Sequence, residues 1–111
     1  FWTAWRGGVL AGFAALKELD GDAAEVKSMR AAPEARGTGV GRALLEHVVA
    51  EARARGHARL YLETGTAPLH QPAIGLYRSR GFTSCPPFAD YEASPHNQFM
   101  MLALSPASHT A

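Results

Sequence analysis

The residues best suited to chemistry form a glycine-rich stretch, Arg36-Gly37-Thr38-Gly39-Val40-Gly41-Arg42. A helical apolar pattern starts at Val40, so the stretch lies at a helix N-terminus, where free N–H groups and a partial positive charge attract anions. Glycines at every second position let a phosphate approach those amides, and the two arginines can add charged contacts. The stretch therefore predicts a site for a phosphate-bearing ligand.

Two common phosphate-binding motifs do not fit this stretch. A Walker A loop ends in Gly-Lys-Ser/Thr, whereas the chain has Gly41-Arg42-Ala43. The dinucleotide fingerprint is Gly-x-Gly-x-x-Gly in a βαβ unit, whereas the spacing here is Gly-x-Gly-x-Gly after antiparallel strands. On these residues alone, a glycine turn that binds no ligand stays open as well.

Covalent and metal chemistry have less support in the sequence. Cys85 could act as a nucleophile with His70 or His96 as its base, but a small buried thiol explains it equally well. The sequence contains neither an HExxH motif nor paired cysteines, so we expect no metal.

Strand and helix signals indicate which elements position these residues. Gly7-Gly8 joins two strand-like runs and predicts a hairpin, and Gly56 and Gly81 end two helical patterns. The predicted elements are strands over 1–6, 9–18 and 24–30, a helix from Val40 to Gly56, a strand over 58–63, a loop over 64–71, a helix over 73–80 that follows Pro72, and strands over 82–85 and 97–104.

This order, β-β-β-α-β-α-β-β, predicts a mixed α/β (α+β) domain. Its central sheet is mostly antiparallel, and a helical crossover makes one parallel pair between strands 24–30 and 58–63. Residues 1–104 are expected to form a single domain, and residues 105–111 a flexible tail.

Composition excludes several classes of protein. The 111 residues are 47% hydrophobic and 19% charged, which is typical of a globular domain. A net charge of +1 gives no electrostatic case for nucleic acid or an anionic membrane, and no apolar run reaches the roughly 20 residues of a membrane span. The single cysteine, Cys85, fits a reducing compartment, so we expect a cytoplasmic protein.

Two segments carry a resemblance to a known family. Met29–Leu45 resembles the acetyl-CoA-binding motif of the GNAT superfamily of N-acetyltransferases, because Arg36–Gly41 matches its hallmark Arg/Gln-x-x-Gly-x-Gly/Ala. Leu76–Phe82 resembles the family's Leu-Tyr-x-x-x-Gly-Phe segment and follows at the expected distance. The resemblance covers roughly residues 2–104. Within the family, three segments resemble a bacterial subgroup of small acetyltransferases: Leu62–Gly65, Cys85–Phe88 and Phe99-Met100.

The resemblance implies an acyl-CoA N-acyltransferase-like fold and acetyl-CoA as co-substrate. The acetyl group would move to an amine of a small molecule or peptide by direct attack in a ternary complex. Residues expected to bind the cofactor are Met29 and Ala31, through their main chains, and Arg36, Gly37, Thr38, Gly39, Gly41 and Arg42, at the pyrophosphate.

The same resemblance suggests catalytic residues. Tyr77 matches the tyrosine expected to protonate the departing thiolate. The alternative is that its aromatic ring only packs on the sheet, and it could also do both. Glu25 is the candidate general base, against the alternative of an exposed strand carboxylate, and Glu63 competes for the role. His70 stands where the family often has an asparagine, which leaves that cofactor contact open.

Family members normally have a strand and two helices before the hairpin that opens here, so the domain is expected to be N-terminally incomplete. Two alternatives to an enzyme follow from this expectation. The chain could be a non-catalytic acyl-CoA-binding or regulatory module, or it could be a fragment completed by another chain. A homodimer is also left open.

Overall fold

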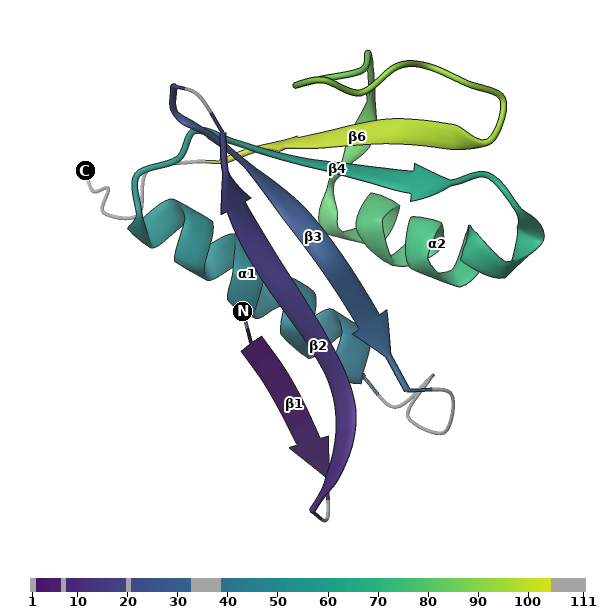
Figure 1. Ribbon diagram of the computed structural model, residues 1–111. Coiled ribbons are helices and arrows are strands. Elements are labelled where there is room, and N and C mark those ends of the chain that lie inside the picture. Colours follow the sequence, from purple (N-terminus) through teal and green to yellow (C-terminus); the bar gives the residue numbers. More distant parts are fainter. Residues whose placement is uncertain (1, 7, 20, 33–38, 105–111) are drawn as a thin grey trace.

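The computed structural model describes residues 2–6, 8–19, 21–32 and 39–104, and among them six strands form one sheet (Figure 1). The elements are β1 (Trp2–Arg6), β2 (Val9–Glu18), β3 (Ala23–Ala31), α1 (Val40–Ala54), β4 (Arg59–Gly65), the 3₁₀ helix η2 (Pro68–His70), α2 (Gln71–Arg80), β5 (Thr83–Cys85) and β6 (Asn97–Ala103). The predicted order of strands and helices is confirmed.

The predicted loop over 64–71 is wrong in two respects. β4 continues to Gly65, because its residues up to that point pair with β6 as far as Asn97. Pro68 then starts the 3₁₀ turn that leads into α2, and α2 begins at Gln71 with Pro72 in its first turn. Proline suits both positions, since its fixed φ matches a helix start and its missing N–H would be unpaired there anyway.

The sheet has the strand order β1-β2-β3-β4-β6-β5, and four of its five pairings are antiparallel. The parallel pair joins β3 and β4 after the α1 crossover, as predicted. Its register covers only Ala23–Glu25 against Arg59–Tyr61. Beyond these residues the two strands have no common register, and the sheet opens.

A bulge in β3 lies beside this opening. Ala15 of β2 pairs with Lys27, and Phe13 pairs with Arg30, so a step of two residues on β2 faces a step of three on β3. The extra residue therefore falls at positions 28–29. A bulge bends its strand and increases its twist, which helps β3 to turn away from β4.

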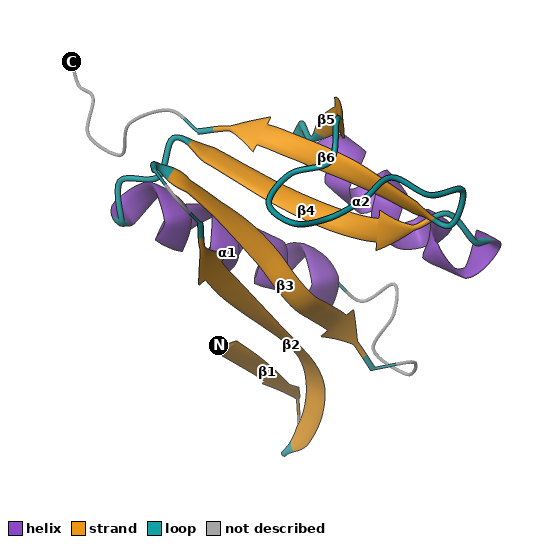
Figure 2. Cartoon of the chain, turned by 45° about the horizontal axis from the view of Figure 1, so that its top comes forward, coloured by secondary structure: helices purple, strands orange, loops and turns teal. Residues whose placement is uncertain are grey.

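Both helices cover one face of the sheet, and the loop over 86–96 crosses the other face in front of β4 and β6 (Figure 2). The four-residue apolar spacing of α1 produces this arrangement, since it places one continuous stripe against the strands. The buried residues of that stripe are Val40, Leu44, Leu45, Val48, Val49 and Ala52, and they share a core with Ala14, Val26, Leu60, Leu62 and Met100. Within the described residues, neither helix is long and apolar enough to cross a membrane.

Candidate active site

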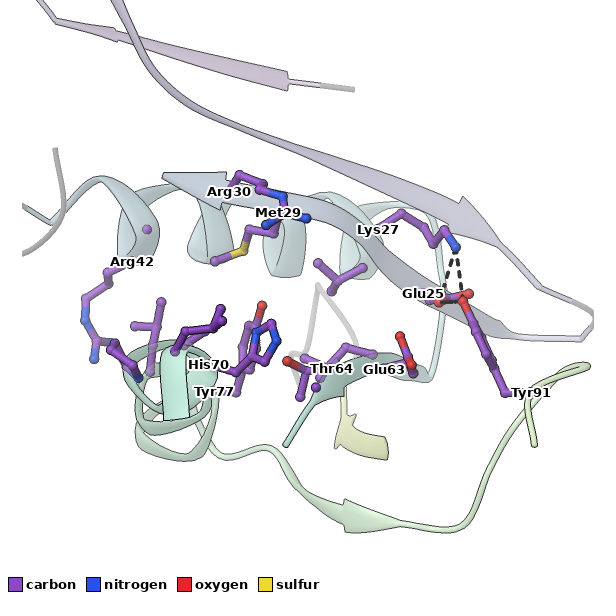
Figure 3. A pocket seen from close by; sticks show the side chains of 18 of the residues that line it. Glu25, Lys27, Met29, Arg30, Arg42, Glu63, Thr64, His70, Tyr77 and Tyr91 are labelled. Carbon is purple, nitrogen blue, oxygen red and sulfur yellow. Dashed lines mark hydrogen bonds and ion pairs between the residues drawn. The ribbon is translucent and has the colours of Figure 1, made fainter. Parts of the chain in front are cut away.

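A cavity of about 800 Å³ occupies the opening between β3 and β4 (Figure 3). Its volume lies in the range of small-molecule sites. The start of α1, the 3₁₀ turn with α2, and the loop over 86–96 complete its walls. The polar residues that line it are Glu25, Lys27, Arg30, Arg42, Glu63, Thr64, His70, Tyr77 and Tyr91.

The start of α1 forms one end of the cavity. Gly39 is the N-cap residue, with a φ of +91° that favours glycine. No side chain caps this terminus, and no acidic residue lies in the first turn. Gly39, Gly41 and Arg42 all line the cavity, and the Arg42 guanidinium donates a 2.7 Å hydrogen bond to Ser79 Oγ. This end has the amides and positive charge that an anion requires. The other predicted pyrophosphate residues, Arg36, Gly37 and Thr38, lie outside the described residues.

Tyr77 and His70 line the middle of the cavity, between Arg42 at one end and Glu25 at the other (Figure 3). Tyr77 is only 7% exposed, and the centroid of its ring lies 5.8 Å from that of the Phe82 ring. Both roles that the sequence allowed for Tyr77 are thus compatible with its position. Burial raises the pKa of Tyr77, so the hydroxyl keeps its proton at neutral pH.

His70 packs over β4. A Cβ atom added to Gly65 would collide with the imidazole ring, so the glycine leaves the space in which the ring lies. The ring forms part of the cavity wall.

The main chain of β3 provides a further wall. Residues 26–31 continue beyond the last pair with β4, so this side of the strand is open to another extended chain. Met29 lies here, at the bulge, and its half-buried side chain points into the cavity (Figure 3). Ala31 is the last residue of the same strand.

Glu25 lies at the opposite end of the cavity from Gly39 and differs from one sequence expectation. The alternative of an exposed strand carboxylate is wrong, because Glu25 is only 2% exposed. Its Oε2 accepts a 2.6 Å hydrogen bond from the Tyr91 hydroxyl and lies 3.9 Å from Lys27 Nζ. These two partners compensate for the burial of a polar group. The competing carboxylate, Glu63, is half-buried and lines the same end.

Lys27 and Tyr91 are hydrogen-bonded to each other, and each has a raised pKa. Lys27 Nζ donates a 3.0 Å hydrogen bond to the Tyr91 hydroxyl, which is the largest cause of the raised pKa of Lys27, followed by the negative charge of Glu25. The pKa of Tyr91 is also raised, first by its hydrogen bond to Glu25 and then by burial. The lysine therefore stays charged and the tyrosine stays neutral around neutral pH.

Cys85 is not part of this site. It lies in β5 at the edge of the sheet, outside the cavity lining, so it is not placed with His70 as a nucleophile and its base. Burial raises the pKa of its thiol, which disfavours the reactive thiolate. Within the described residues, no group of three or more His, Cys, Asp or Glu side chains could hold a metal ion.

The polar roles of Lys27 and Tyr91 are not among the features predicted from the sequence. The strand period offered one signal, since Lys27 lies two residues after Glu25 and therefore on the same face. Tyr91 lies 66 residues beyond Glu25 in the chain. Only the path of the loop over 86–96 brings the two together, and the local pattern carries no signal for it.

Comparisons with known proteins agree with this geometry. The profile of the acetyltransferase (GNAT) family matches residues 1–82. YsnE of Bacillus subtilis (strain 168), an uncharacterized N-acetyltransferase, is 49% identical over 100 residues, which are 90% of this chain and 66% of that protein. YedL of Escherichia coli (strain K12), also an uncharacterized N-acetyltransferase, is 45% identical over 104 residues, which are 94% of this chain and 65% of that protein.

A solved structure shares the architecture. A Klebsiella pneumoniae protein assigned as an acyl-CoA N-acyltransferase has a TM-score of 0.82 at 33% identity, over 88% of this chain and 66% of that one. The chain thus spans slightly less than two thirds of the length of these three proteins. The match of the family profile to most of the sequence, supported by the two relatives, shows that the chain belongs to the acetyltransferase (GNAT) family.

Proposed function

We propose that this chain contains the cofactor site and the catalytic base of an acetyl-CoA-dependent N-acetyltransferase. One observation carries the proposal: a single cavity joins an anion-binding helix start, a buried neutral tyrosine and a buried carboxylate. This order suits acetyl transfer, because the phosphates and the thioester follow one another along a bound acetyl-CoA and the attacking amine approaches beyond the thioester. The names of both relatives, which describe N-acetyltransferases, support the same reaction.

The cofactor would lie along the opening of the sheet. Its pyrophosphate would bind the amides at Gly39 and Gly41, with Arg42 beside them, and Arg36, Gly37 and Thr38 remain proposed contacts on their sequence motif alone. Its pantetheine arm would pair with the open side of β3 at Met29 and Ala31, as an added strand does. The bulge near Met29 supports this placement, because it turns β3 away from β4 and makes room between them.

Glu25 would act as the general base. The acceptor binds as an ammonium ion and must lose a proton before its nitrogen can attack. Glu25 takes that proton, directly or through a water molecule, and the nitrogen lone pair then forms a bond to the thioester carbonyl carbon. The C–S bond breaks, and the electron pair leaves on sulfur as the thiolate of coenzyme A. The nitrogen loses its second proton as the amide forms, and a proton taken up from solvent converts the thiolate into the free thiol.

Tyr77 would stabilise this thiolate. An ordinary thiol has a pKa of about 8.5, whereas the ordinary value for Tyr77 is 10.0 and burial raises it further. Complete proton transfer from tyrosine to a solvated thiolate is therefore uphill by at least about 2 kcal/mol. Hydrogen bonding to the developing charge is the larger share of its contribution, so we expect a moderate rather than an absolute dependence on the hydroxyl.

We infer that the acceptor is an amine of a small molecule or a peptide. Glu25 and Glu63 at the acceptor end of the cavity would favour a cationic amine. We further infer that residues 1–104 act as one domain and that it works in the cytoplasm, as the unpaired Cys85 suggests. The binding-only alternative has no specific observation in its favour, since Glu25 and Tyr77 line the same cavity as the helix start.

The test combines binding with turnover. Calorimetry measures coenzyme A binding to the chain, and mass spectrometry follows acetylated products from a panel of amines, amino acids and peptides incubated with acetyl-CoA. Saturable binding together with an acetylated product supports the proposal. Binding without any product, from an intact protein with the same cavity, would instead support the binding module.

A further inference from the structure

Three polar groups at the acceptor end of the cavity form one connected set (Figure 3). Lys27 Nζ donates to the Tyr91 hydroxyl over 3.0 Å, and that hydroxyl donates to Glu25 Oε2 over 2.6 Å. A tyrosine hydroxyl has one proton to donate. Because Lys27 can only donate, the hydroxyl proton is directed at Glu25, and the orientation of the set is determined.

Both interactions converge on one carboxylate oxygen. The ion pair with Lys27, like the hydrogen bond from Tyr91, is made to Oε2. Among the described residues, Glu25 Oε1 has no hydrogen-bond partner. Glu25 is also the one charged side chain described as buried, so its orientation is set by these partners rather than by water.

The position of Tyr91 depends in turn on the loop over 86–96. The centroid of its ring lies 5.1 Å from that of Phe88 and 5.8 Å from that of Phe99 of β6. The Phe88 ring also packs on Tyr61 of β4, with 4.8 Å between the ring centroids. These aromatic contacts hold the loop on the face of the sheet opposite to the helices (Figure 2). These aromatic contacts therefore place the hydroxyl of Tyr91 beside Glu25, and none of them involves the start of α1 at the other end of the cavity.

We propose that Tyr91 is a positioning residue, which together with Lys27 occupies Oε2 of Glu25 and so leaves Oε1 as the oxygen that receives the proton of the acceptor. This inference rests on the proposed role of Glu25 as the base. Removal of the hydroxyl releases the carboxylate to rotate, which lowers the fraction of complexes in which it can accept the proton. The cofactor end, on the other side of Tyr77, is unaffected.

Tyr91→Phe tests the proposal, and Tyr61→Phe is the matched control. Both changes remove one hydroxyl from the same aromatic cluster, but the Tyr61 hydroxyl has no hydrogen bond within the described residues and its side chain does not line the cavity. We expect Tyr91→Phe to lower kcat for the acceptor about ten-fold or more, with the KM for acetyl-CoA within two-fold. Tyr61→Phe should leave both values within about two-fold of the parent.

A double variant separates positioning from general damage. If Tyr91 acts through Glu25, adding Tyr91→Phe to Glu25→Gln should cause little further loss of kcat. Equal effects of Tyr91→Phe and Tyr61→Phe, or a full additional loss in the Glu25→Gln background, would overturn the proposal.

A chain that binds coenzyme A but acetylates no amine would contradict the proposed function. The hydrogen bond between Tyr91 and Glu25 can then still be tested by measuring the free energy of unfolding. In urea titrations, the effects of Tyr91→Phe and Glu25→Gln on the free energy of unfolding should be coupled. Additive effects would show that the hydroxyl does not hold Glu25, and this proposal would fail on its own account.

Discussion

Gly12→Ala offers a strict test of how the sheet and α1 pack beneath the cofactor site. Gly12 is buried in β2, and a Cβ atom there would lie 2.6 Å from the carbonyl oxygen of Arg30 and 2.9 Å from Leu44 Cδ1. The first contact is with backbone that pairs in the sheet, so it cannot be relieved by rotating a side chain. Overpacking of this kind costs about 1–3 kcal/mol.

A smaller effect opposes this cost. Alanine restricts the unfolded chain more than glycine does, which raises the free energy of unfolding by about 0.4–1 kcal/mol. The two ranges leave a net loss in the free energy of unfolding between about 0 and 2.6 kcal/mol. Because the shortest contact is with backbone, we expect the upper half of this range, which lowers the melting temperature by roughly 5–12 °C for a chain of this size. The added Cβ also lies 3.1 Å from Val40 in the first turn of α1, so displacement of that turn should weaken coenzyme A binding although Gly12 itself does not line the cavity.

Gly75→Ala is the matched control, because it makes the same change in α2 where a Cβ meets nothing within 4 Å. Alanine is favoured over glycine in a helix by about 0.5–1 kcal/mol, so this variant should melt a few degrees higher than the parent. Calorimetric melting curves of the three proteins compare the two substitutions directly. A Gly12→Ala protein that melts at or above the parent would refute the packing of β2 against β3 and α1 described above.

Three further predictions concern the site. Gly39→Glu should weaken coenzyme A binding at least ten-fold in calorimetry, because it puts a negative charge at the pyrophosphate; Gly39→Asn, which tolerates the left-handed backbone better, should lose much less. Tyr77→Phe should lower turnover about ten-fold while leaving coenzyme A affinity unchanged, and equal turnover would reduce Tyr77 to a packing role. The raised pKa values of Tyr77, Tyr91 and Lys27 mean that the folded protein holds these protons more tightly than the unfolded chain. Their contribution to stability is complete below about pH 10 and falls at higher pH, so urea midpoints should drop as the pH rises above about 10, and less steeply in Tyr77→Phe.

Local signals predicted most of the fold. The apolar period of α1 placed its buried face, Gly56 and Gly81 marked the ends of two helices, and the helix between two strands indicated the single parallel pair. These features depend on residues close together in the chain. The glycine-rich stretch could likewise be recognised from spacing alone, and its described part, Gly39 to Arg42, lies in the cavity wall.

Features that depend on distant residues could not be predicted in the same way. The bulge at positions 28–29 arises from the register between β2 and β3, which neither strand reveals alone. Glu25 alternates with apolar residues as an exposed strand carboxylate would, but the loop over 86–96 covers it and supplies its hydrogen bond from Tyr91. The burial of the predicted base therefore follows from a contact 66 residues away along the chain.

The central claim is that the opening between β3 and β4 binds acetyl-CoA, and an NMR titration with coenzyme A tests it most directly. A second cavity of about 240 Å³, between β1 and α1 at Trp2, Leu44 and His47, serves as an internal comparison. We predict that the amide signals of Met29, Gly39, Gly41 and Tyr77 move in a saturable manner while those of Trp2 and His47 stay in place. Movement confined to Trp2 and His47, or no movement at millimolar coenzyme A, would contradict the assignment of this site.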